Sequence, residues 1–244
     1  MLERIKGFFK NKRNIVTIII CIVAFIFVLL FTPIFTVKNI RVAGNEKIES
    51  ETIINMSGIS NGENIFKTDF AQVKKNISKV SYVDTVNVKM KFPDTIIITV
   101  TEAKPSAYIN FIGSYVAISE MGKILDIKDN FEEIDKPIVY GVKVNSFEIG
   151  TQVITDDQHR AELLYLMLNQ INLSGIVDKI QYLDISDTDN ITMTLRNKIS
   201  VKFGNTDSIK YKISYLKSVL DTLKEETGGV IDLRDTTNVM YDAG

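Results

Sequence analysis

Residues 83–102 read "VDTVNVKMKFPDTIIITVTE" and predict the β-hairpin around which the first folded domain is built. The runs "VDTVNVKM" and "TIIITVTE" are rich in β-branched residues, and they flank "KFPD", in which Pro93 and Asp94 indicate a turn. Alternate residues of a strand point to the same face, so each run predicts one apolar face. The alternating apolar residues are Val86, Val88 and Met90 in the first run and Ile96, Ile98 and Val100 in the second.

A further strand is predicted before the hairpin, in "FTVKNIRVAG" at residues 35–44. In a regular strand Phe35 and Val37 would point to one face, and Ile40 and Val42 would point to the opposite face. Either a bulge falls near Lys38 or the regular strand starts only at residue 39.

Two short helices are predicted between that strand and the hairpin. In "IESETIINMSG" a helix can bury three apolar residues, and Gly58 indicates its end. A second helix can be capped by Thr68 or Asp69. Residues 35–102 therefore predict a β-α-α-β-β unit in which both helices cover one face of a three-stranded sheet. The expected buried residues are Ile53, Ile54 and Met56 in the first helix and Phe70, Val73 and Ile77 in the second.

Short strands separated by Gly, Asn or Asp continue to residue 244 and predict a second, mostly antiparallel β domain. Pro105, in "AKPSAYI", interrupts the strand pattern and indicates the boundary between the domains, near residue 104. Two helices are expected within the second domain, at about 157–172 and 207–226. The expected strands are 115–119, 123–126, 138–141, 179–185, 191–195 and 199–203, followed by "GGVIDLR" and "NVMYD".

An uninterrupted apolar run, "IVTIIICIVAFIFVLLF" at residues 15–31, precedes both domains. As a helix it is about 26 Å long at about 1.5 Å per residue, which nearly spans a bilayer, and residues 32–35 can complete the span. A cleaved signal peptide is disfavoured because no small-residue cleavage site follows, and a buried core helix because no face is polar. We therefore expect a single transmembrane helix at 15–34. The bases of residues 1–14 would stay in the cytoplasm.

The sequence offers little support for catalysis. The only cysteine, Cys21, lies in the apolar run, so disulfides and thiol chemistry are excluded outside it. His159 is the only histidine, and a metal site with Asp156 and Asp157 would lack the further ligands that zinc requires. No serine-nucleophile motif occurs, and "SGISNGENIF" lacks the ending of a phosphate-binding loop. A set of lysines is interpreted as a solvated helix face or as a basic patch: Lys74, Lys75 and Lys79.

Five stretches in this order resemble the FtsQ/DivIB family of bitopic bacterial cell division proteins: "FTVKNIRVAGN", "GISNGENIF", "KFPDTIIITVTEAKPSAYI", "EMGKILD" and "VIDLR". The resemblance covers nearly the whole chain. It implies an α+β protein with a cytoplasmic tail (1–14), a transmembrane helix (15–34), a POTRA domain (35–103) and a family-type β domain (104–244).

The resemblance also implies a function without catalysis, cofactor or nucleic acid. Family members act as scaffolds that join FtsL-type and FtsB/DivIC-type coiled-coil proteins at the division septum and influence septal peptidoglycan synthesis. They sit in the plasma membrane, in contact with its lipid, with their folded domains outside. The partner adds a strand to the last edge of the β domain. The matching positions here are Asp232, Leu233 and Arg234, with Val239 and Tyr241 in the following strand, and Arg234 is expected to meet an acidic partner residue.

Two other functions remain as alternatives. POTRA domains also assist protein export or assembly by receiving chains through strand addition, although an outer-membrane barrel would need many more strands than this chain offers. A membrane-tethered cell-wall enzyme would need a catalytic constellation that the sequence does not offer.

Overall fold

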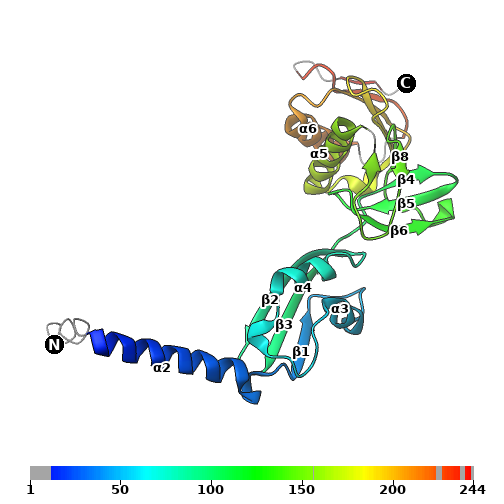
Figure 1. Cartoon of the computed structure of the whole chain (residues 1–244). Coiled ribbons are helices and arrows are strands. Elements are labelled where there is room, and N and C mark those ends of the chain that lie inside the picture. Colours follow the sequence, from blue (N-terminus) through cyan, green and yellow to red (C-terminus); the bar gives the residue numbers. More distant parts are fainter. Residues whose placement is uncertain (1–11, 156, 224–226, 237–239, 243–244) are drawn as a thin grey trace. The chain divides into compact units, whose positions relative to one another are not determined.

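The computed structural model describes residues 12–155, 157–223, 227–236 and 240–242. The chain divides into two compact units, each treated by itself. The first contains residues 1–78 and 84–102, and the second contains residues 79–83 and 103–244. Figure 1 labels their elements along the chain.

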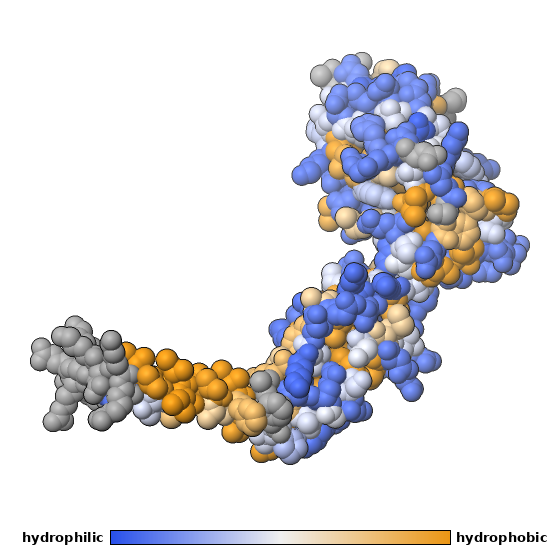
Figure 2. Space-filling model, in the orientation of Figure 1, coloured by the Kyte–Doolittle hydropathy of each residue, from blue (hydrophilic) through white to orange (hydrophobic). Residues whose placement is uncertain are grey.

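Helix α2 (Lys12–Phe31) covers the apolar run. Most of its large apolar side chains between Ile15 and Val28 are exposed, and Figure 2 shows apolar residues along the helix. Within the described ranges, no helix is both long enough and apolar enough to count as a membrane span. A helix is therefore present where one was predicted, while its crossing of a bilayer stays a prediction. A 3-10 turn, η1 (Pro33–Phe35), follows it.

The first unit has the predicted β-α-α-β-β order. It contains β1 (Asn39–Ala43), α3 (Ser50–Ser57), η2 (Ile65–Lys67), α4 (Phe70–Ile77), β2 (Val83–Lys91) and β3 (Thr95–Glu102). The strands form a sheet in the order β1-β3-β2, with β1 parallel to β3. The regular strand starts at Asn39, which decides between the two alternatives left open at Lys38.

The apolar alternation of the hairpin forms the core of this unit. Ile96, Ile98 and Val100 are buried, as is Val88 in the partner strand. Asp69 caps α4 by accepting hydrogen bonds from the N–H groups of residues 71 and 72. One expectation is wrong: Met56 is 42% exposed, because the last turn of α3 buries Ser57 instead.

The second unit is built on a nine-stranded sheet in the order β14-β13-β12-β11-β10-β7-β4-β5-β6. The sheet is mixed: β4 with β7, β7 with β10 and β12 with β13 are parallel pairs. The other five pairs among the described strands of this sheet are antiparallel, so most of the pairing is antiparallel, as predicted. A small hairpin of β8 and β9 stands apart from it. The strands are β4 (Ala107–Phe111), β5 (Ser114–Ile118), β6 (Ile124–Lys128), β7 (Ile138–Tyr140), β8 (Val144–Ser146), β9 (Ile154–Thr155), β10 (Ile180–Asp184), β11 (Ile191–Leu195), β12 (Ser200–Gly204), β13 (Val230–Asp232) and β14 (Met240–Asp242).

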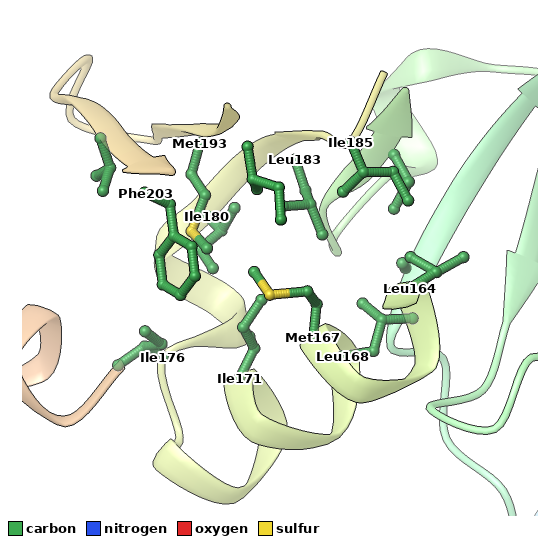
Figure 3. Close-up of a cluster of buried hydrophobic side chains, with 14 of the residues drawn as sticks. Leu164, Met167, Leu168, Ile171, Ile176, Ile180, Leu183, Ile185, Met193 and Phe203 are labelled. Atoms are coloured by element: carbon green, nitrogen blue, oxygen red, sulfur yellow. The ribbon is translucent and has the colours of Figure 1, made fainter. Parts of the chain in front are cut away.

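Both predicted helices are present, as α5 (Gln158–Ser174) and α6 (Ile209–Thr222). They lie beside each other, and α5 points its apolar side chains at the sheet (Figures 1 and 3). The apolar stripe of α6 is buried at Ile213, Leu216 and Leu220 and partly buried at Ile209 and at Leu223, which follows the last residue of the helix. In α5 the fully buried residues are Leu164, Met167, Leu168 and Ile171, which face Ile180, Leu183, Met193 and Phe203 of the sheet.

Strand β4 was not among the predicted strands. Pro105 was interpreted as the end of the strand pattern, yet it precedes β4, and the buried run from Ala107 to Ile109 enters the sheet between β7 and β5. Strands β8 and β9 were not predicted either. They are three and two residues long, which is too short to give a periodic signal.

A turn at the surface of the first unit depends on one carboxylate. The oxygens of Glu102, at the end of β3, accept hydrogen bonds from the N–H groups of Glu46, Lys47 and Ile48, each at 2.9 Å. Burial opposes the charge, but these three backbone N–H groups and the Lys47 ammonium outweigh it and lower the pKa of Glu102. The preceding Gly44 has φ +83° and faces the Val100 carbonyl so closely that a Cβ would clash.

We predict that Glu102→Gln destabilises the first unit by about 1 kcal/mol at neutral pH, because an amide replaces a charged acceptor of three N–H groups. The folded pKa of Glu102 lies below its unfolded value, so its contribution is complete above the unfolded pKa and is lost as the pH falls through the folded pKa. Calorimetry of the full chain in detergent should show the difference between wild type and variant closing below about pH 4.

The matched control is Asp84→Asn, an exposed carboxylate on β2 of the same unit. This variant should unfold at the same temperature as the wild type. If the difference in stability between wild type and Glu102→Gln were the same at pH 7 and in acid, the role given to the Glu102 charge would be contradicted.

Candidate partner-binding edge

The sheet of the second unit ends at β14, which has only β13 as a neighbour among the described strands. The two strands are antiparallel, with Val230 opposite Asp242, Ile231 opposite Tyr241 and Asp232 opposite Met240. Among the described strands nothing neighbours the outer side of β14, and a sheet edge of this kind can accept an added strand.

The side chains of these edge strands alternate between two faces, and the two faces have different surroundings. Tyr241 lies opposite the buried Ile231, packs against the core, and its hydroxyl donates to the Gly228 carbonyl at 3.4 Å. On the other face Lys202, Asp232 and Met240 are neighbours across β12, β13 and β14. Met240 is 58% exposed. The accessible row at the edge is thus Lys202, Asp232 and Met240.

Asp232 and Arg234 form a local ion pair just after β13. The Arg234 Nη2 lies 2.6 Å from Asp232 Oδ2, and its Nε lies 3.0 Å from Oδ1. The Arg234 backbone N–H also donates to Asp232 Oδ1, at 3.1 Å. The Arg234 side chain is 54% exposed, so the guanidinium is held in one place at the surface with part of its donor capacity facing solvent.

The charges of the pair reinforce each other. The Arg234 side-chain hydrogen bond lowers the pKa of Asp232, with a further contribution from the Arg234 N–H and the charges of Arg234 and Lys202, while burial opposes the shift. The hydrogen bond to Asp232, and then the charge of that carboxylate, raise the pKa of Arg234. Both groups therefore stay ionised over the whole physiological range.

The predicted site residues are placed differently from one another. Asp232 and Arg234 lie together at the edge, whereas the Leu233 side chain is fully buried and its N–H donates to the Lys202 carbonyl at 2.8 Å. A partner at the surface would meet the neighbours of Leu233 and not its side chain. Tyr241 turns towards the core, and Val239 lies outside the described residues.

Lys202 and Met240 were not among the predicted site residues. For Met240 a signal was present, because adjacent residues of a strand point to opposite faces, and the choice of Tyr241 selected the residue that packs inwards. The parity of a short edge strand becomes clear only when its register to the neighbour is known.

A buried lysine fixes the end of β12 next to this edge. Lys212 of α6 is 2% exposed, and its Nζ donates to the carbonyls of Phe203 and Asn205, both at 3.0 Å. The ammonium also lies 5.2 Å from the centre of the Phe203 ring. Burial lowers the pKa of Lys212, and the nearby Asp207 opposes that shift. Between the two carbonyl acceptors, Gly204 has φ +74° and lies against the Arg234 side chain.

A polar cavity of this unit contains His159, the histidine considered as a metal ligand with Asp156 and Asp157, and Asp156 lies outside the described residues. His159, at the exposed first turn of α5, lines a cavity of about 350 Å³ together with Glu162, Asp189 and Asp207. Across the described ranges, no three His, Cys, Asp or Glu side chains lie together so that they could hold an ion. Asp157 instead caps α5 by accepting the Arg160 N–H at 3.0 Å.

Two protein families match the chain. The family "POTRA domain, FtsQ-type" matches residues 35–103, and "Cell division protein FtsQ/DivIB, C-terminal" matches residues 107–234. The second match ends at Arg234, so β14 lies beyond it.

Named relatives are similar over most of their length. A cell division protein DivIB of Clostridium acetobutylicum is 32% identical over 213 residues, which cover 86% of this chain and 83% of the relative. A DivIB of Clostridium botulinum is 27% identical over 95% of this chain and 93% of its own. A cell division protein FtsQ of Syntrophotalea carbinolica is 28% identical over 83% of this chain and 71% of its own.

We predict that Lys212→Ala destabilises the end of β12 by about 2 kcal/mol, because two carbonyls lose their donor. Hydrogen exchange of the full chain, followed by mass spectrometry, should show roughly thirtyfold faster exchange in peptides covering β12 and α6. Lys210→Ala, an exposed lysine of the same helix, is the control and should not change exchange. Unchanged protection in the Lys212 variant would mean that its hydrogen bonds do not stabilise this edge.

Proposed function

The chain belongs to the FtsQ/DivIB family of bacterial cell division proteins, which are not enzymes, and on this premise we propose the role it has in the divisome. It is a scaffold that binds FtsL-type and FtsB/DivIC-type coiled-coil proteins through the open edge at β14. Through these partners it influences the septal peptidoglycan synthase. No nucleic acid and no cofactor take part.

The observation that supports this proposal is the position of β14 as the last strand of the described sheet, beside a fixed charge. Backbone groups on the outer side of β14 can pair with an extended segment of the partner, whatever its side chains are. Specificity then needs side chains at the end of the added strand. Arg234 supplies a guanidinium group whose position Asp232 already fixes. The planar set of N–H donors of a guanidinium matches the geometry of a carboxylate.

In the proposed complex the site residues have different tasks. Arg234 contacts an acidic partner residue and Asp232 orients it. Tyr241 contributes through the backbone of β14, and Leu233 fixes the start of the Arg234 loop from inside the core. Val239, which lies outside the described residues, is retained as a proposed contact. Met240, exposed on the solvent face, is added as a side-chain contact.

Family membership implies a protein of the division-site membrane. We propose that residues 15–34 are its anchor, with residues 1–14 in the cytoplasm and both folded units outside. The proposal is supported by the apolar, uncharged sequence from Ile15 to Phe31 and by the basic residues before it.

We predict that Arg234→Glu weakens binding of the partner ectodomain about tenfold, because reversal of the charge replaces an attraction by a repulsion at the edge. The measurement is a titration of the full chain in nanodiscs with the soluble coiled-coil ectodomain. Wild-type affinity should also fall as salt is added, and the variant should show less of this dependence.

The matched control is Lys217→Glu, which makes the same change of charge on the exposed face of α6. It should bind like the wild type. Equal affinities of all three proteins would remove Arg234 from the interface, and a lowered melting temperature of the Arg234 variant would shift the effect to folding.

A second prediction concerns the cell. Depletion of the protein should give undivided filaments in which protein export continues, since the scaffold acts at septation and not in translocation. Microscopy and fractionation of exported proteins measure the two effects. An export defect without filaments would favour the alternative function in protein export or assembly.

A further inference from the structure

Three phenylalanines from separate segments of the first unit pack together. Phe35 ends η1, Phe66 lies in η2 and Phe92 stands at the tip of the β2–β3 hairpin. Their ring centres are 5.4 Å apart for Phe35 and Phe66, 5.6 Å for Phe66 and Phe92, and 6.5 Å for Phe35 and Phe92. We call these three residues the phenylalanine cluster.

The cluster is not part of the hydrophobic core. Phe92 is 58% exposed, Phe35 and Phe66 are half-buried, and the neighbouring Ile34 is 56% exposed. The core of the same unit is formed by other residues, such as Ile96 and Ile98, which are fully buried. Exposing contiguous aromatic surface has a free-energy cost in water, so such a patch indicates a partner.

The chain itself identifies that partner. Phe35 lies four residues after the end of α2, a distance of at most about 14 Å. The joint is also held firmly, because the Val37 N–H donates to the Glu63 carbonyl and the Gly62 N–H donates to the Val37 carbonyl, both at 2.8 Å. Since the polar layer of a bilayer is roughly 5 to 8 Å thick on each side, an anchor that ends at residue 34 places Phe35 within that layer.

The charges around the cluster fit the same partner. An exposed lysine lies within three residues of each ring: Lys38 after Phe35, Lys67 after Phe66 and Lys91 before Phe92. Lys38 is 3.9 Å from Asp94, an exposed and therefore weak ion pair. Aromatic rings bordered by bases are the composition of segments that enter the interface of negatively charged membranes.

We propose that the phenylalanine cluster inserts into the lipid interface and docks the tip of the first unit on the outer surface of the membrane that holds the anchor. This proposal rests on the anchoring of residues 15–34 proposed above. It adds a second attachment point, formed by the folded unit itself, so the unit would be fixed to the bilayer and not only tethered.

The chain contains no tryptophan, so single substitutions provide unique fluorescent probes. We predict that Phe92→Trp in the full chain, reconstituted in anionic vesicles, is quenched at least about twofold by lipids brominated near the headgroup. Glu46→Trp is the matched control. It is exposed at the opposite end of the same sheet, beyond the far end of the β1–β3 register, and it should not be quenched.

A third probe, Ile22→Trp within α2, separates this inference from the anchor on which it rests. If Ile22→Trp is quenched by lipids brominated near the bilayer centre while Phe92→Trp is quenched no more than Glu46→Trp, the anchor stands and the docking is wrong. If Ile22→Trp is not quenched, both proposals fail. A blue-shifted but unquenched Phe92→Trp would mean that protein covers the cluster, for example a second copy, which also overturns the docking.

The lysines have a test of their own. Quenching of Phe92→Trp should be stronger in anionic than in neutral vesicles, and adding Lys91→Glu should reduce that difference. Equal quenching in both kinds of vesicle would remove the lysines from the interaction.

Discussion

The parallel pairing of β12 with β13 determines where the candidate site lies. Parallel neighbours cannot be joined by a tight turn, so the chain must cross over the sheet between them, and α6 is that crossover. The apolar stripe of α6 packs on the sheet. After this helix the chain re-enters the sheet at Val230, the first residue of β13. Lys212, on the same helix, binds the carbonyls at the end of β12. Helix, strand end and ion pair therefore form one connected arrangement that stabilises the edge of the sheet.

The same constraint explains the parallel pairs of the second domain, which the prediction of a mostly antiparallel domain did not specify. Helix α5 lies in the connection between β7 and β10, which are also parallel neighbours. Each helix of this domain was predicted correctly, but its role as a crossover was not inferred. A strand, an amphipathic helix and a further strand in succession favour a parallel pair, and that pattern was present in the sequence at both places.

Local patterns predicted the first unit well because its alternation, caps and turn agree with one another. Asp69 caps its helix as expected, and the apolar face of β3 is buried as its alternation predicted. Met56 was predicted wrongly because a helix of two turns can bury either side of its last turn, and only its packing decides. At the candidate site, the motif located Asp232 and Arg234, but no local pattern could reveal that Leu233 between them is buried. Nor could one reveal the burial of a lysine on α6, since burial of a charge depends on carbonyls that the fold brings from elsewhere.

In the proposed complex the ion pair of Asp232 and Arg234 would serve recognition more than stability. Exposed pairs contribute little to folding, because water screens the charges and ordering the side chains has an entropic cost. Here the backbone N–H of Arg234 also binds the carboxylate, so the guanidinium is already ordered before a partner arrives. A partner carboxylate would then need to order only itself, and it could bind donors that Asp232 leaves unused. Next to an open strand edge, whose backbone pairing is indifferent to sequence, a fixed charge of this kind provides the selectivity that strand addition alone lacks.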